Sequence, residues 1–275
     1  MDGLKTGWIM QLSFFYKRTQ PSGKIRGQQI ADYLIAKHNP ENGYENDVCI
    51  HVKKLMPETY PKNTFIDIID SRTLVHWVAA HPDVGVIAIS KTAQKYLKKK
   101  LGRQDVHFIP EHHCNFENIR RKPRKVTTVG YMGCRTGSVF PEDMEERFAK
   151  IGLKFIYTRH YPTRQDVVDF YKTIDIQVMH KYNRSSAIWM LKNPLKLANA
   201  GSFGIPSVAY PEANFLEEFK DCFIEAETFD EMINQCRKLT ENETFYQAVA
   251  TKALARSRNY HIDKIAPLYK KCTLK

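Results

Sequence analysis

Residues 193–209 read NPLKLANAGSFGIPSVA, and this stretch decides the fold of the chain. It predicts a short loop, a helix, a Gly-Ile-Pro turn and then a buried strand. The small side chains of Ala198 and Gly201 let such a helix pack closely against a sheet. Lys196 lies in the first helical turn, where a cation and free backbone N–H groups together favour an anion.

The same alternation of strands and helices continues on both sides of this stretch. Apolar runs predict strands at residues 7–15, 47–52, 65–69, 84–89, 106–109, 126–131, 153–158, 174–179, 206–210 and 223–226. Buried strands that alternate with helices are typical of parallel, doubly wound sheets. Residues 120–125, RRKPRK, have no apolar face and are predicted to be a linker. The chain is therefore expected to form two Rossmann-like domains, at residues 1–119 and 126–275.

Composition narrows the class of protein. The chain has 275 residues, 43% of them hydrophobic, but no apolar run long enough for a transmembrane helix and no evident signal peptide. Its six cysteines are scattered without a C-x-x-C pair, which argues against a zinc site and predicts reduced thiols in a cytoplasm. The net charge of +12 lies mostly in the first 125 residues, so that half is expected to meet a polyanion or an anionic surface.

The opening stretch resembles the donor-site segment P-x-K-x-x-E-x-x-x-x-G-x-P-V of the GT-B glycosyltransferases, in particular those similar to family 4 (group 1). Lys196 matches the lysine of that segment, and Gly204 and Pro206 match its turn. Asn199 stands where the family has an acid that contacts the ribose, and no acid lies near Leu191, where retaining members have one. The resemblance implies two domains that face a cleft, a sugar-nucleotide site in the second domain and a last helix that crosses back onto the first. It leaves retention or inversion open.

A second segment resembles the same family. Residues 130–135, GYMGCR, are similar to the G-x-x-G/S-x-R turn of the donor domain. Glycine at position 133 lets the backbone approach a diphosphate, and Arg135 can neutralise it. With Lys196, Arg135 would form a clamp that stabilises the leaving nucleotide without requiring a metal or another cofactor. Tyr182, in a polar loop, and Asn193, at the helix start and also suited to capping it, are further candidate donor contacts.

Candidate residues in the first half are fewer. Residues 22–27, SGKIRG, resemble the glycine-bearing first loop of GT-B acceptor domains, so Gly23, Lys24 and Arg26 are expected near the acceptor or the donor phosphate. This loop lacks the Walker spacing, and no G-x-G-x-x-G follows a strand, which disfavours an NTPase or an NAD enzyme. Asp70, at the end of a strand, is the candidate catalytic base, and a helix N-cap is its structural alternative. The pair His112–His113 is the second candidate base, and no metal site is predicted.

Together these patterns predict a cytoplasmic glycosyltransferase that moves a sugar from a UDP- or GDP-sugar to a hydroxyl of an anionic acceptor. Two acceptors stay open: a membrane lipid or surface glycan, which would place the protein peripherally at a membrane, and DNA with hydroxymethylated bases. The basic helix predicted at residues 92–101 suits either of them. Two other functions also stay open. One is a non-catalytic nucleic-acid or membrane-binding protein on a degenerate GT-B scaffold, and the other is a sugar-nucleotide epimerase.

Overall fold

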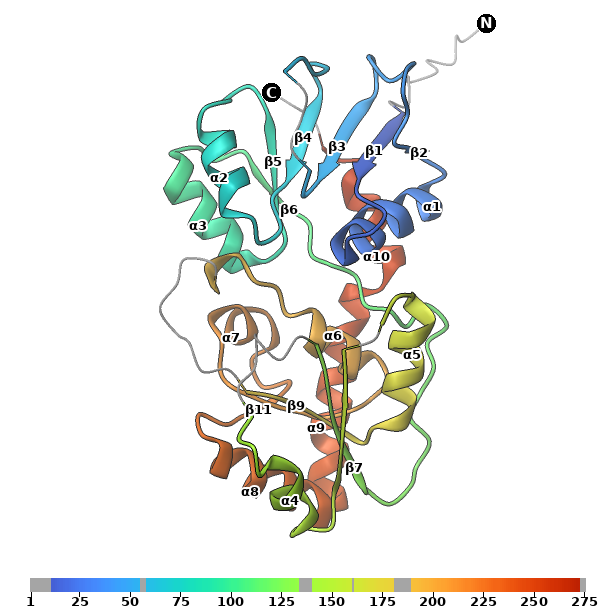
Figure 1. Ribbon diagram of the computed structural model, residues 1–275, viewed down its shortest axis with the longest axis vertical. Helices are drawn as coiled ribbons and strands as arrows, with labels where there is room; N and C mark the ends of the chain where they lie inside the picture. Colours follow the sequence, from blue (N-terminus) through green and yellow to red (C-terminus); the bar gives the residue numbers. More distant parts are fainter. Residues whose placement is uncertain (1–10, 55–57, 134–139, 160, 181–188, 273–275) are drawn as a thin grey trace, which may run out of the picture. The chain divides into compact units, whose positions relative to one another are not determined.

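A computed structural model describes residues 11–54, 58–133, 140–159, 161–180 and 189–272 (Figure 1). The chain divides into two compact units. Unit 1 comprises residues 1–89, 94–109 and 266–275, and unit 2 comprises residues 90–93 and 110–265. The predicted last helix is therefore divided between the two units: its residues up to 265 belong to unit 2, and those from 266 onward belong to unit 1.

Unit 1 is built on a parallel sheet in the order β2-β1-β3-β4-β5-β6. Its strands are β1 (Leu12–Tyr16), β2 (Lys37–His38), β3 (Val48–Val52), β4 (Thr64–Asp67), β5 (Gly85–Ala88) and β6 (Val106–Phe108). Strands β1, β3, β4 and β5 are buried along their whole length, as expected for a sheet covered on both faces. The helices are a π-helical turn (Gly23–Gln29), α1 (Ile30–Leu34), α2 (Arg72–Ala79), α3 (Lys91–Leu101) from residue 94 onward, and the second half of α10 (Ile262–Tyr269).

A buried ion pair lies inside unit 1. The Arg26 Nε donates to Asp67 Oδ2 at 2.6 Å, and Arg26 Nη2 donates to the Ile109 carbonyl at 2.9 Å. The side chains of Arg26 and Asp67 are 1% and 0% exposed. Tyr269 of α10 donates its hydroxyl to Asp67 Oδ2 at 3.3 Å and packs edge-on against Phe14. Removing one partner of such a pair leaves an uncompensated buried charge, which is strongly destabilising.

Unit 2 is built on a second parallel sheet, in the order β11-β10-β9-β7-β8. Its strands are β7 (Thr128–Met132), β8 (Lys154–Thr158), β9 (Ile176–Met179), β10 (Ser207–Ala209) and β11 (Ile224–Glu225). The helices are α4 (Met144–Ala149), α5 (Arg164–Thr173), α6 (Leu195–Ser202), α7 (Ala213–Phe219), α8 (Phe229–Glu241), α9 (Glu243–Ser257) and the first half of α10. Residues 193–209 thus contain α6 and β10, the helix and strand that the sequence predicts. Both units have the predicted α/β class.

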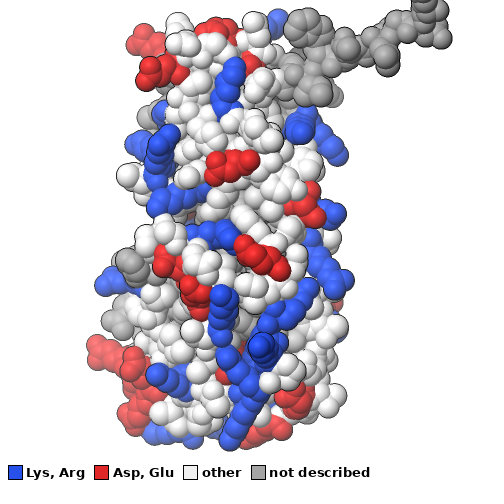
Figure 2. All heavy atoms as spheres, turned by 90° about the vertical axis from the view of Figure 1, so that its right-hand side faces the viewer, with Lys and Arg blue, Asp and Glu red and all other residues white. Residues whose placement is uncertain are grey.

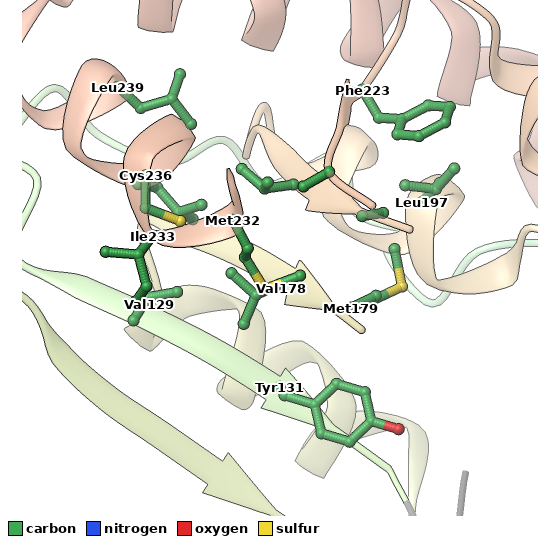
Figure 3. Packing of buried hydrophobic residues seen from close by; sticks show 14 of the residues in the cluster. Val129, Tyr131, Val178, Met179, Leu197, Phe223, Met232, Ile233, Cys236 and Leu239 are labelled. Carbon is green, nitrogen blue, oxygen red and sulfur yellow. The ribbon is translucent and has the colours of Figure 1, made fainter. Parts of the chain in front are cut away.

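The core of unit 2 lies between the sheet and its helices (Figure 3). Val129 of β7 and Val178 of β9 pack with Met232, Ile233 and Cys236 of α8. On another side α6 packs against α9 so closely that a Cβ at Gly201 would lie 2.7 Å from the Ala253 carbonyl oxygen. The small residues of α6 therefore serve close packing, as the sequence pattern predicts.

The segment 120–125 differs from its prediction. The division into units falls between residues 109 and 110, and 120–125 belongs to unit 2 rather than to a linker. The reason is Asp175, a fully buried carboxylate that accepts hydrogen bonds from Arg121 Nε at 3.0 Å and Arg124 Nε at 2.7 Å. Backbone N–H groups of Thr127 and Thr128 donate to the same carboxylate at 2.9 and 3.0 Å. The charges and the proline of this segment are typical of a linker, and the acid that binds its arginines lies 51 and 54 positions later in the sequence.

Candidate functional site: the ends of β7 and α6

The turn after β7 is held in place by the neighbouring strand β8. The Gly133 N–H donates to the Thr158 carbonyl at 3.0 Å, and the Tyr157 hydroxyl donates to the Gly133 carbonyl at 3.1 Å. Gly133 has φ +149°, and a Cβ there would lie 2.8 Å from the Tyr131 hydroxyl oxygen. Both backbone groups of Gly133 are thus engaged by the protein. The missing side chain of Gly133 therefore lets the Tyr131 hydroxyl and the Lys196 side chain lie against the turn.

Lys196 reaches this turn from the first turn of α6. The Lys196 Nζ lies 5.7 Å from the centroid of the Tyr131 ring, within the range of a cation–π contact. The Lys196 Cε would lie 3.4 Å from a Cβ built on Gly133. The structure therefore brings Lys196 and Gly133 together at the carboxyl end of β7, the end of a parallel sheet where ligands bind. Two of the other predicted donor contacts, Arg135 and Tyr182, lie outside the described residues.

Tyr131 is a residue of this site that the sequence analysis did not single out. It lies at the carboxyl end of β7, at the margin of the hydrophobic core (Figure 3), and is 3% exposed. Its ring stacks on Tyr157 with centroids 6.0 Å apart and planes 3° apart. Tyr157, Tyr131 and Lys196 thus follow one another from β8 through β7 to α6. An aromatic residue near the end of a predicted strand, two positions before the glycine of the turn, is the sequence signal that could have identified Tyr131.

The first turn of α6 is fixed by polar contacts. Asn193 accepts a hydrogen bond from the Leu195 N–H at 3.2 Å, while Pro194 occupies the N-cap, so the predicted cap is displaced by one residue. The Asn193 amide also donates to the Glu111 carboxylate. Gln177 of β9 donates to the Lys196 carbonyl at 3.0 Å. These contacts set the position of the helix start, and with it the base of the Lys196 side chain.

Asn199 has a structural partner. Its side-chain oxygen accepts the Cys114 backbone N–H at 2.8 Å, and the residue is 6% exposed. Asn199 therefore ties residues 110–115 to α6. This hydrogen bond uses one of the two lone pairs of the amide oxygen, and the contact with a ribose that the family resemblance suggests for Asn199 stays a prediction.

The candidate residues of unit 1 are distributed differently. Gly23 packs closely against the backbone of Lys17, since a Cβ at Gly23 would lie 2.2 Å from the Lys17 carbonyl oxygen. Lys24, the next residue, is partly exposed. Arg26, predicted to lie in a phosphate-binding loop, is instead committed to Asp67 in the core. Asp70 forms an ion pair with Lys53 at 2.5 Å and remains partly exposed. The N-cap of α2 is Ser71 and not Asp70, since the Ser71 side chain accepts the Leu74 N–H at 3.3 Å.

The second candidate base, the pair His112–His113, is buried in unit 2. Burial, with a smaller contribution from His261, lowers the pKa of His113 to about 3. The His113 ring lies 5.3 Å from the His261 ring, and its Nδ1 accepts the Asn115 N–H at 3.2 Å. A ring that is enclosed in this way is suited to packing rather than to taking a proton from a substrate.

Two further features are absent from the described part of the chain. Within it, no three His, Cys, Asp or Glu side chains gather in an arrangement that could hold a metal ion. None of its helices is both long enough and apolar enough to span a bilayer.

Comparison with solved structures shows what this fold is similar to. The chain resembles Anabaena HepE in complex with UDP-glucose with a TM-score of 0.62 and 11% identity, covering 95% of this chain and 98% of that chain. It resembles a glycosyltransferase from Rickettsia africae with a TM-score of 0.64 and 9% identity, covering 96% and 98%. It also resembles a variant of S. aureus TarM in complex with fondaparinux, α-GlcNAc-glycerol and UDP, with a TM-score of 0.59 and 13% identity, covering 83% and 55%.

These likenesses confirm the predicted fold. The chain has the α/β GT-B fold of these structures, over nearly the whole length of two of them. No protein-family model and no curated protein sequence matches the chain.

Proposed function

We propose that this protein is a glycosyltransferase that moves a sugar from a UDP- or GDP-sugar to a hydroxyl of an anionic acceptor. The observation that carries the proposal is the convergence of Lys196 and Gly133 at the ends of α6 and β7. Support comes from the structures with the same fold, one described in complex with UDP-glucose and another in complex with UDP. The excess of basic residues, +12 overall, supports an anionic acceptor.

The proposed role of Lys196 follows from its position. Its ammonium group, on the first turn of an eight-residue helix, adds a full positive charge to the partial positive charge of the helix start. A diphosphate held there would gain most when the bond to the sugar breaks and negative charge develops on the departing nucleotide. Arg135, two residues beyond Gly133, is proposed as the second cation, and Tyr182 as a contact to the nucleotide sugar.

Asp70 is proposed as the base that takes the proton from the acceptor hydroxyl. A base needs to be ionised and partly accessible, and Asp70 is paired with the Lys53 ammonium and 27% exposed. Replacing Asp70 by Asn should lower the turnover rate by about 100-fold or more and leave nucleotide binding unchanged. An equal loss of nucleotide binding would instead point to a structural role.

The test of the donor site is calorimetry with UDP, GDP and uridine. Lys196→Gln should weaken binding of the better nucleotide by about tenfold, equivalent to about 1.4 kcal/mol, with uridine unaffected. The matched control is Lys238→Gln, which removes an exposed lysine of α8 and should change nothing. The proposal fails if neither UDP nor GDP binds, or if the Lys196 variant binds both as the natural protein does.

A second measurement separates transfer from the alternatives. Incubation with a UDP-sugar and an acceptor should release free UDP as the sugar is transferred. Binding without release would indicate a non-catalytic module on the same fold. An epimerised sugar nucleotide without release would indicate an epimerase.

A further inference from the structure

The segment 120–125 is a concentrated basic feature of unit 2. Five of its six residues are cations: Arg120, Arg121, Lys122, Arg124 and Lys125. We call this segment the basic strap. All of its cations are exposed except Arg121, which is partly buried. Figure 2 shows Lys and Arg side chains on the side of the molecule that carries α5 in Figure 1. The excess of charge in the first 125 residues therefore belongs in part to unit 2.

The basic strap is held rigidly although it has no regular secondary structure. The Arg121 N–H donates to the Phe203 carbonyl at 2.9 Å, and Arg120 Nη1 donates to the Ser202 carbonyl at 2.7 Å. The buried Asp175 then binds the guanidinium groups of Arg121 and Arg124. Cations that are fixed before a partner arrives lose less conformational entropy on binding.

The basic strap carries more positive charge than its surroundings neutralise. Asp175 supplies one negative charge to two guanidinium groups, and in the described part of the chain neither Lys122 nor Lys125 has a carboxylate partner. Burial and the nearby charge of Arg258 lower the pKa of Arg120, so a further cation lies beside the strap. Acids on neighbouring elements have cations of their own: Asp169 pairs with Lys172 at 3.0 Å, and Glu117 pairs with Arg164 at 2.6 Å.

We infer that the basic strap is a docking surface for a linear acidic glycan, a polymer of sugars that carries carboxylate, phosphate or sulfate groups. In the proposed function this polymer is the acceptor, and only that last step rests on the proposed function. Charge complementarity selects a polyanion.

The strap's own composition argues against a single-stranded nucleic acid and against a lipid bilayer. The strap has no aromatic residue on which the bases of a single strand could stack. The large hydrophobic side chains that are exposed in the described parts of the chain lie outside the strap, so it offers none to a bilayer: Tyr33, Ile35, Met190 and Leu216.

The test uses the full chain and a heparin-derived oligosaccharide as probe, titrated at several salt concentrations. The strap variant is Lys122→Gln with Lys125→Gln, which spares the arginines that bind Asp175. The matched control is Lys95→Gln with Lys99→Gln, which removes the same charge from exposed positions of α3 in unit 1. The strap variant should bind about tenfold more weakly at low salt, and its slope of log Kd against log salt should fall by about two.

Three outcomes would overturn the inference: no binding of the probe by the natural protein, equal binding by the strap variant, or a loss in the α3 variant as large as in the strap variant. Duplex DNA or phosphatidylserine vesicles that bind through the strap more tightly than the probe would overturn the assignment to a glycan. UDP binding should be the same in all three proteins. If the natural protein bound neither UDP nor GDP, the proposed function would be refuted and the result for the strap would stand.

Discussion

Replacing Tyr131 by leucine removes the ring beneath Lys196 and keeps an apolar side chain at the end of β7. The ammonium lies 5.7 Å from the ring centroid, and the ring itself is almost fully buried. A cation–π contact contributes about 0.5–1 kcal/mol at an exposed site and about 2 kcal/mol when it is desolvated. This pair combines a buried ring with a cation at the start of a helix. Because the ring acts through Lys196, whose own removal is expected to weaken binding about tenfold, we expect about 1 kcal/mol, which raises the Kd for UDP by about fivefold.

The assay is a double-mutant cycle read by calorimetry. Tyr131→Leu, Lys196→Met and the double variant are each titrated with UDP and with uridine, which lacks the phosphates. If the ring acts by holding the ammonium in place, the double variant should bind UDP about as weakly as Lys196→Met alone. Tyr131→Phe keeps the ring and should bind UDP within about twofold of the natural protein.

Two results would refute this reasoning. Equal weakening of UDP and uridine by Tyr131→Leu would mean that the substitution disturbs the whole site and does not act through Lys196. A coupling energy below about 0.3–0.5 kcal/mol would mean that the two side chains act independently. Melting curves of each variant show whether it is folded during the titration.

Three further predictions concern stability. Gly201→Ala places a Cβ 2.2 Å from the Ser257 Oγ and 2.7 Å from a backbone oxygen of α9, so urea unfolding should show a loss of about 1–3 kcal/mol, and an unchanged midpoint would contradict the packing described. Asp175→Asn removes the charge that faces two guanidinium groups and should cost about 3–5 kcal/mol by the same measurement, with a loss under about 1 kcal/mol counting against it. Burial raises the pKa of Asp175, but hydrogen bonds from backbone, arginine and threonine groups outweigh burial, so the pKa in the folded protein is lowered. The stabilisation by Asp175 is therefore fully present above the pKa of the unfolded chain, about 3.9, and is lost as pH falls through the folded pKa. The pKa of His113 is lowered to about 3, so the folded protein should become less stable as pH falls from about 6.5 towards 3, because only the unfolded chain takes up the proton in this range. His113→Gln should flatten this part of the curve of unfolding free energy against pH. An NMR titration of the His113 ring checks the lowered pKa directly.

Strands and their order along the chain could be predicted because burial on both faces leaves a continuous apolar run. Val84 to Ile89 reads this way, and β5 lies within it. The convergence of Gly133 with Lys196 also follows from the sequence, since parallel strands end at the same edge of a sheet. The short edge strand β2 was missed because its two residues, Lys37 and His38, are polar and form no apolar run.

Residues whose role depends on a distant partner could not be assigned from the sequence. Arg26 looks like a loop cation until Asp67, 41 positions later, is seen beside it in the core. Asn199 looks like a weakened ribose ligand, and the sequence does not show that the Cys114 N–H, 85 positions earlier, donates to its oxygen. In each case one polar group satisfies another inside the protein, and only the packed structure identifies the partner.

The contact between Tyr269 and Asp67 has a consequence for synthesis. The two residues are separated by 202 positions, and all of unit 2 from residue 110 onward is made between them. At about 5–20 residues per second, the ribosome needs about 10–40 seconds to cover that distance. Once β6 has been made, the nascent unit 1 has every strand of its sheet but still lacks the tyrosine that packs on Phe14 and bonds to Asp67. Unit 1 therefore cannot complete this contact until all of unit 2 has been synthesised, although unit 1 starts earlier on the ribosome.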